Sequence, residues 1–160
     1  KTYGTVQSVM EPALTAQYAL KKKIRESWEA VEQDLEGQAV KFFMRFIELS
    51  PASLQLFSFK DASSLPSHPG LKRHSLLVLQ TIGQLLSTST DAELMAPALG
   101  AMGERHAKYG VQSDQMELMC EALLWTVARC LGTRCDPDVE NAWREAYAKV
   151  ALHMMAPNVV

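Results

Sequence analysis

Two histidines, His74 and His106, are the residues of this sequence best placed to do chemistry. Each lies on the apolar stripe of its own predicted helix, one formed by Val78, Ile82, Leu85 and Leu86 and the other by Met95, Leu99 and Met102. Spacings of three and four residues put the members of a stripe on one helix face. A neutral imidazole is a common metal ligand, and histidine is a usual ligand of haem iron. On facing helices, the two imidazoles can hold an iron porphyrin between them.

An aromatic cluster precedes the two histidines. Four phenylalanines fall within seventeen residues around the Ser50-Pro51 corner: Phe43, Phe46, Phe57 and Phe59. Haem needs apolar walls, which these rings supply, and three methionines add adaptable side chains: Met102, Met116 and Met119. Aromatic and methionine side chains also fill ordinary cores, and a lone histidine on an apolar face is more often a core residue than a ligand. Two histidines together with the cluster favour haem.

Other reactive residues give weaker signals. His68 lies in a Ser-His-Pro-Gly loop and His153 near the end of the last predicted helix, so we expect a solvent-exposed His68 and no functional role for either. Hydrolase, zinc-protease and phosphate-loop motifs are absent from the sequence. The three cysteines lack metal-binding spacing: Cys120, Cys130 and Cys135. Reduced thiols are the simplest interpretation, with a disulfide between the last two or an intermolecular link left open.

Length and composition indicate one globular domain. The chain has 160 residues, of which 48% are hydrophobic, and a net charge of −2. A nucleic-acid-binding surface would need a basic face, and the one basic run, at residues 21–25, is interpreted as a solvated helix face. The sequence has no apolar run of roughly 18 residues that would span a membrane. We therefore expect a cytoplasmic protein without membrane or nucleic-acid partners.

Helices must position these residues, because strand periodicity is nearly absent. Clusters of Gly, Pro, Ser, Asp and Thr divide the chain into segments with apolar stripes, at about 20–34, 36–50, 51–57, 70–87, 91–109, 114–131 and 137–155. Ser113 or Asp114 is a candidate cap for the sixth segment, and Asp136-Pro137 opens the seventh. The unequal lengths and the lack of heptads predict an irregular all-α globule rather than a four-helix bundle.

Residues 1–19 differ in pattern from the rest of the chain. Their apolar residues lack a clean helical stripe but are too many for a typical disordered tail. We predict an extension over 1–19 that is flexible or ordered by a partner, a folded domain over 20–156, and a tail over 157–160.

The sequence resembles the globin family from about residue 22 to residue 155. The matching segments, in globin order and spacing, are IRESWEAV (24–31), LSPASLQLF (49–57), LKRH (71–74), MGERHAKYGV (102–111), CLG (130–132) and AWREAY (142–147). The combination of Trp28, Pro51, Phe57, His74 and His106 is specific. The set looks most like neuroglobin and related haem globins. This resemblance implies a three-over-three helical sandwich around haem b, which is iron protoporphyrin IX.

The resemblance also implies roles for individual residues. His106 matches the proximal iron ligand and His74 the distal histidine. Phe57 matches the phenylalanine packed on the porphyrin, Val78 the apolar residue one turn after the distal histidine, and Phe43 the bulky distal residue of the second helix. Other positions of the haem pocket are occupied by Phe59, Leu77, Met102, Tyr109, Met116, Leu123 and Tyr147.

Two departures from the family pattern stand out. Leu77 occupies a position where many relatives place a Lys or Arg that reaches a haem propionate, so we expect this anchor to come from elsewhere: Arg73, Arg105 or Lys108. The loop before His74 is shorter than in neuroglobin and lacks its cysteine pair, so a disulfide switch in that loop is not available.

The function implied by the resemblance is reversible binding of a diatomic gas (oxygen, nitric oxide or carbon monoxide) at iron held by His106. His74 either ligates the resting iron or donates a hydrogen bond to bound oxygen. A hexacoordinate iron favours sensing, nitric oxide dioxygenation or nitrite reduction over bulk oxygen transport, with a reductase or a homodimer as open partners. The alternatives are a haem-free sensory or interaction module on the same fold, and a peroxidase-like enzyme that uses His74 as acid–base catalyst.

Overall fold

The chain is helical across the residues that the computed structural model describes, which are 3–88, 91 and 93–156, with side chains described from residue 11 onward. In chain order the elements are α1 (Tyr3–Glu32), α2 (Leu35–Leu49), the 3₁₀ helix η1 (Pro51–Leu56), α3 (Pro69–Ser87), α4 (Ala96–Lys108), α5 (Ser113–Leu131), the 3₁₀ turn η2 (Gly132–Arg134) and α6 (Pro137–Met155). The predicted all-α class is confirmed. Among these described helices, none is both long and apolar enough to cross a membrane.

Local sequence signals account for most helix boundaries. Asp34 caps α2 by accepting a hydrogen bond from the backbone N–H of Gly37 (3.2 Å), and Asp136 caps α6 by accepting one from Val139 (2.9 Å). Proline occupies the first turn of η1, α3, α4 and α6, where its missing N–H leaves no helical hydrogen bond unmade.

Two helix starts differ from the sequence-based expectation. Gln112, rather than either of the next two residues, caps α5 through reciprocal hydrogen bonds with Gln115. The fifth predicted segment was expected from about residue 91, but α4 begins at Ala96. Pro97 explains this late start, because it has no N–H to donate to a carbonyl four residues earlier.

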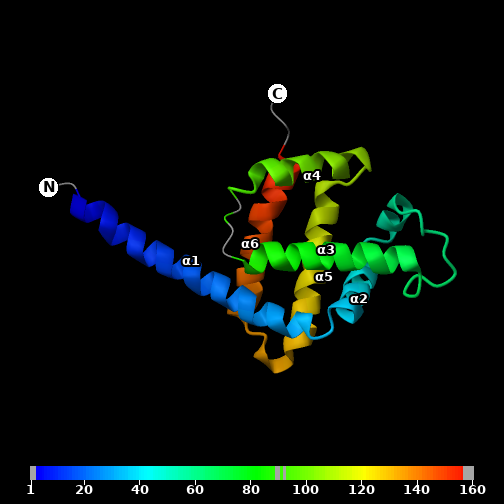
Figure 1. Cartoon of the computed structure of the whole chain (residues 1–160), viewed down its shortest axis with the longest axis horizontal. Helices are drawn as coiled ribbons and strands as arrows, with labels where there is room; N and C mark the ends of the chain where they lie inside the picture. Colours follow the sequence, from blue (N-terminus) through cyan, green and yellow to red (C-terminus); the bar gives the residue numbers. More distant parts are fainter. Residues whose placement is uncertain (1–2, 89–90, 92, 157–160) are drawn as a thin grey trace.

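Helix α1 extends well beyond the segment predicted from the sequence. It has 30 residues and contains Pro12, whereas a helix was expected only from about residue 20. Residues 11–19 are all exposed, and Figure 1 shows this half of α1 projecting from the other helices. The predicted extension over 1–19 is therefore helical from residue 3, while its ordering by a partner stays a prediction. The predicted tail over 157–160 lies outside the described residues.

The inner half of α1 packs on the helices that form the body. Trp28 lies against Gly83 of α3, and its ring centroid is 6.2 Å from that of Trp143 in α6. The Trp143 indole N–H donates a buried hydrogen bond to the Ser27 hydroxyl (2.7 Å). α2 packs on α3 and α5, and α4 packs on α6 (Figure 1). These contacts place α3 and α4, which carry the two histidines, on the same body.

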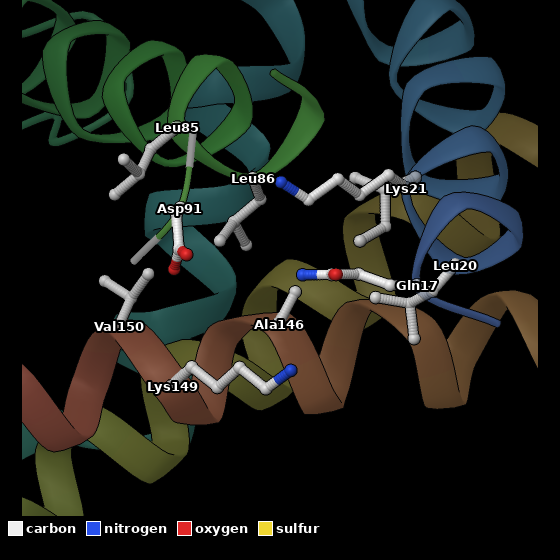
Figure 2. A pocket seen from close by; sticks show the side chains of 10 residues that line it. Gln17, Leu20, Lys21, Leu85, Leu86, Asp91, Ala146, Lys149 and Val150 are labelled. Carbon is white, nitrogen blue, oxygen red and sulfur yellow. The ribbon is translucent and has the colours of Figure 1, made fainter. Parts of the chain in front are cut away.

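A small crevice lies where α1 leaves the body, between α1, α3 and α6 (Figure 2). Its volume is about 80 Å³, and its lining includes Leu20, Leu86 and Val150 with the side chains of Lys21 and Lys149. Neither His74 nor His106 lines it. This crevice is therefore separate from the site predicted from the two histidines.

Replacing Gly83 with alanine tests the close approach of α1 to α3. An added Cβ would overlap the ring carbons of Trp28, so the helices would have to separate. Alanine normally stabilises a helix relative to glycine, yet here we expect Gly83→Ala to lower the free energy of unfolding by about 1–3 kcal/mol. Urea denaturation measures the change, with the exposed α3 variant Gln84→Ala as a control. An unchanged or higher stability for Gly83→Ala contradicts the prediction.

Candidate haem site

His106 is held in the tautomer that a metal ligand requires. It lies in the last turn of α4, half-buried, and its Nδ1 lies 2.8 Å from the carbonyl oxygen of Met102, one turn earlier. A carbonyl oxygen only accepts, so Nδ1 carries the proton and donates this hydrogen bond. The lone pair of the ring is therefore on Nε2, where it is available to a metal.

His74 lies on α3 and is electrostatically coupled to His106. Burial lowers the pKa of His74, and a proton on His106 would lower it further. Both effects disfavour the imidazolium, so His74 is neutral at pH 7 and has a nitrogen lone pair to offer. The two predicted ligands therefore lie on different helices, His74 on α3 and His106 on α4.

Two phenylalanine rings contact His74, and a third ring stacks on one of them. The ring centroid of His74 is 5.3 Å from that of Phe43 and 5.1 Å from that of Phe57. Phe57 stacks on Phe59 with the centroids 5.0 Å apart, and Phe43 meets both rings edge-on. Phe43 is fully buried and Phe59 nearly so, whereas Phe57 is half-buried. The predicted aromatic wall therefore forms beside the predicted distal histidine.

The corner that presents Phe57 is fixed by residues that no sequence motif singles out. Ser53 in η1 is fully buried, and its hydroxyl oxygen lies 2.6 Å from that of Ser50. The side-chain amide of Gln115 donates to the Ser53 hydroxyl (2.8 Å), which ties η1 to the start of α5. The only sequence signal for Gln115 is its position at a helix start, where it can take part in a cap. Its other partner, Ser53, lies 62 residues away in the chain, and no local pattern predicts that contact.

The remaining predicted pocket residues divide into enclosed and exposed sets. Leu123 and Tyr147 are buried, and the Tyr147 hydroxyl donates to the carbonyl of Met116 (3.0 Å). Burial raises the pKa of Tyr147, so its hydroxyl keeps its proton. Val78, Met102 and Met116 are half-buried. Leu77 and Tyr109 are instead 63% and 72% exposed, so the structure does not bring them into the enclosed group.

The charged and histidine side chains outside this group lie nearer the surface. The three candidates for propionate anchoring, Arg73, Arg105 and Lys108, are all exposed on α3 and α4. His68 and His153 are both half-buried, so the expectation of a solvent-exposed His68 is wrong. His68 is buried because it caps α3 next to Phe59, whereas His153 lies 3.3 Å from a carboxylate oxygen of Glu93.

The donor set of the site suits haem. Across the described part of the chain, no group of three or more His, Cys, Asp or Glu side chains could hold a metal ion by itself. Two neutral imidazoles suit iron whose other ligands come from a porphyrin, and aromatic and methionine side chains suit its apolar faces. His106 would hold the iron, His74 would offer a second imidazole nitrogen, and Phe57 would supply an apolar wall for the cofactor.

Comparison with known proteins places the chain in a family. A family model described as globin matches residues 40–154. The chain is 34% identical to the anaerobic nitrite reductase AHB2 of Arabidopsis thaliana over 81% of its length and 85% of the relative's. It is 32% identical to an anaerobic nitrite reductase of Brassica napus, covering 83% and 86%. It is 24% identical to the anaerobic nitrite reductase GLB0 of Physcomitrium patens, covering 96% and 88%. The chain belongs to the globin family.

Family membership confirms the resemblance and the haem-globin class. A globin takes haem as its cofactor and a diatomic gas as its ligand, which agrees with the donor set of this site. The relatives above are plant proteins, so the likeness to neuroglobin is the lesser one within the family. Leu77, Tyr109 and the other individual pocket residues stay predictions.

Replacing His106 with alanine tests the assignment of the proximal ligand. We expect His106→Ala to purify with several-fold less haem per chain than the wild type, because the variant lacks the imidazole that would ligate the iron. Haem content is measured as the ratio of Soret to protein absorbance. His153→Ala is the matched control, since it removes a half-buried histidine whose partner is Glu93. Full haem with an unchanged spectrum in His106→Ala would exclude His106 as the ligand.

Proposed function

We propose that this chain is a haem b globin in which His106 and His74 both ligate the resting iron, and that it binds diatomic gases and reduces nitrite. The observation that carries the proposal is the coupled pair of imidazoles. His106 has its Nε2 free because Nδ1 bonds to Met102, and His74 is kept neutral by burial and by His106. We include a cytoplasmic location in the proposal.

The geometry favours His74 as an iron ligand over a freely moving distal residue. Its ring packs against Phe43 and Phe57, both within 5.3 Å between centroids, so little freedom is left to lose when the imidazole binds iron. Its lowered pKa makes it a poor reservoir of protons. His74 therefore acts as an internal ligand that a gas must displace, rather than as a standing acid.

The chain's own residues control access to the iron and its surroundings. When bound, haem supplies reversible gas binding and one-electron redox chemistry. The stacked Phe57 and Phe59 rings exclude water from the side of His74, and Phe43 closes the space above them. The hydrogen bond from His106 Nδ1–H to the Met102 carbonyl raises the basicity of Nε2 and sets the orientation of the ring.

Nitrite chemistry is supported by the names of the relatives. Reduction of nitrite to nitric oxide consumes one electron and two protons and releases water. With haem bound, the electron would come from its ferrous iron, and a reductase of the cell would return the iron to the ferrous state. The relatives described above are called anaerobic nitrite reductases, which favours this reaction over bulk oxygen transport.

A spectrum and an assay test the proposal. The ferrous, ligand-free protein is expected to give the sharp visible bands of a low-spin, bis-histidyl haem. Anaerobic addition of nitrite to the ferrous protein is expected to release nitric oxide, measured with an electrode, at a rate that rises as pH falls because protons are consumed. A purified chain without a Soret band supports the haem-free alternative. A high-spin ferrous spectrum contradicts ligation by His74.

Replacing His74 with leucine separates its role as ligand from its role in the fold. If about nine-tenths of the wild-type molecules are closed by His74, then His74→Leu is expected to bind carbon monoxide about tenfold faster. Flash photolysis or stopped flow of the ferrous protein measures the rate. Gln80→Ala, at another exposed position of α3, is the control and is expected to leave the rate unchanged. Equal rates in His74→Leu and wild type mean that His74 does not bind ferrous iron.

We also propose that the projecting half of α1 pairs with the same segment of a second copy. Leu14 and Tyr18 are 58% and 66% exposed and lie one turn apart on one face of α1. Glu11 precedes them on this face and Lys22 follows. An antiparallel pair of helices would set Leu14 against the other copy's Tyr18, and Glu11 against its Lys22. The face is therefore complementary to itself, as a twofold interface requires.

Charge introduced on this face is expected to separate the two copies. The double variant Leu14→Glu with Tyr18→Glu puts four carboxylates into the proposed interface, so its mass by light scattering is expected to be half that of the wild type. The control, Ala13→Glu with Ala16→Glu, changes other exposed positions of the same helix. The haem spectrum is expected to be unchanged in both variants. A monomeric wild type, or equal masses for all three proteins, rejects this pairing.

A further inference from the structure

The first turn of α3 depends on a histidine for one of its backbone hydrogen bonds. Pro69 has no N–H to satisfy, and Lys72 donates its N–H to the His68 carbonyl as the first bond of the helix (3.1 Å). Between them, the N–H of Gly70 donates to Nδ1 of His68 (3.0 Å). An imidazole nitrogen thus serves here as the helix cap, where Ser, Thr, Asp or Asn is usual.

This cap exists for one protonation state of His68 only. A backbone amide can only donate, so Nδ1 must hold a lone pair and the proton of the neutral ring must be on Nε2. The imidazolium has two N–H donors and no acceptor, so protonation removes the cap. It also places a positive charge at the positive end of the helix dipole. Histidine is the side chain that changes charge near physiological pH.

The surroundings of the His68 ring connect it to the candidate site. A Cβ at Gly70 would lie 3.1 Å from the His68 ring and 3.4 Å from Phe59, so glycine makes room for the ring between them. The centroids of His68 and Phe59 are 5.8 Å apart, and Phe59 stacks on Phe57, which contacts His74. His68 therefore reaches His74 by two routes, along the first turn of α3 and through the stacked rings.

The charged groups near His68 do not neutralise an added proton. Lys60 and Asp61 follow Phe59 in the loop, and Lys72 and Arg73 lie on the first turns of α3. All four are exposed, and within the described residues none forms an ion pair with His68. Three of the four are cations. Protonation of His68 thus removes a hydrogen bond without giving an ion pair in return.

We propose that His68 is a positioning residue for His74. While its ring is neutral, His68 holds the first turn of α3 in place, and when the ring is protonated that turn loosens. This inference rests on the proposed role of His74 as an internal iron ligand. With the cap in place, His74 is held against Phe43 and Phe57 and ready to bind iron. Without it, the first turn of α3 frays, His74 gains freedom, and the fraction of iron open to an external ligand rises as pH falls.

Two substitutions of His68 distinguish the effect of the helix cap from the effect of protonating the imidazole. His68→Asn keeps a good capping side chain that does not titrate, and His68→Ala removes the cap at every pH. The rate of carbon monoxide binding to the ferrous protein is measured from pH 5.5 to 8.5 in these variants and in wild type. Protonation of His74 itself would also free the iron for an external ligand, but it would do so equally in wild type and His68→Asn. The difference in carbon monoxide binding rate between these two proteins therefore reports the protonation of His68 alone.

The expected rates follow from the cap. At pH 8.5, wild type and His68→Asn bind carbon monoxide equally fast, whereas His68→Ala binds it faster by about two- to fivefold, the range set by loss of a helix cap. At pH 5.5, wild type is expected to bind carbon monoxide faster than His68→Asn. Parallel pH profiles for wild type and His68→Asn overturn the inference, as does an unchanged rate in His68→Ala at pH 8.5.

A second readout keeps the inference distinct from the proposed function. The C–O stretching frequency of the ferrous carbon monoxide complex responds to the position of His74 whether or not His74 binds the ligand-free iron. We expect this frequency to shift at low pH in wild type beyond its shift in His68→Asn, and to be shifted at all pH values in His68→Ala. If the ligand-free ferrous protein is high-spin, the proposed function fails, and the frequency alone decides: equal shifts in wild type and His68→Asn reject the role of His68.

Discussion

The close approach of α1 to α3 at Gly83 is the constraint on which the site depends. The Trp28 ring occupies the space that a side chain at Gly83 would fill, and Trp28 is held in turn beside Trp143. The hydrogen bond from Trp143 to Ser27 lets this buried indole N–H meet a partner without water. Helix α3 is thereby fixed along its second half, so the direction of its first half, which carries His74, is fixed as well.

Proton placement on the two imidazoles decides what chemistry the site can do. The Met102 carbonyl keeps the His106 proton on Nδ1, and burial with the nearby His106 keeps His74 neutral. Two neutral imidazoles make good ligands for iron and poor acids. This distribution agrees with the globin family. The aromatic wall of Phe43, Phe57 and Phe59 completes an apolar surround for a flat cofactor.

The parts of the chain that depart from the family pattern lie at its edges. The family match begins at residue 40, so all of α1 precedes it, including the exposed segment over residues 11–19. Leu77, at a position where the resemblance places a cation in many relatives, is exposed. Arg73, Arg105 and Lys108 on α3 and α4 are also exposed, and their contact with the propionates stays a prediction. The buried core around Phe43 and Leu123, by contrast, lies within the part of the chain that the family model matches.

The sequence by itself determined the helical class, most helix boundaries and the two candidate ligands. These features follow from local patterns: the spacing of apolar residues, the Asp and Pro residues at helix starts, and the order of the globin segments. Such patterns can be identified from the sequence alone, without the fold. It did not determine where α1 begins, because residues 11–19 are all exposed and carry no clean apolar stripe that would indicate a helix. It also missed the tie from Gln115 to Ser53 and the cap from His68 to Gly70. Tertiary structure decided these, since a hydrogen bond across 62 residues depends on how α5 meets η1. The burial of His68 likewise depends on Phe59 being brought against it by a loop whose path no local pattern specifies.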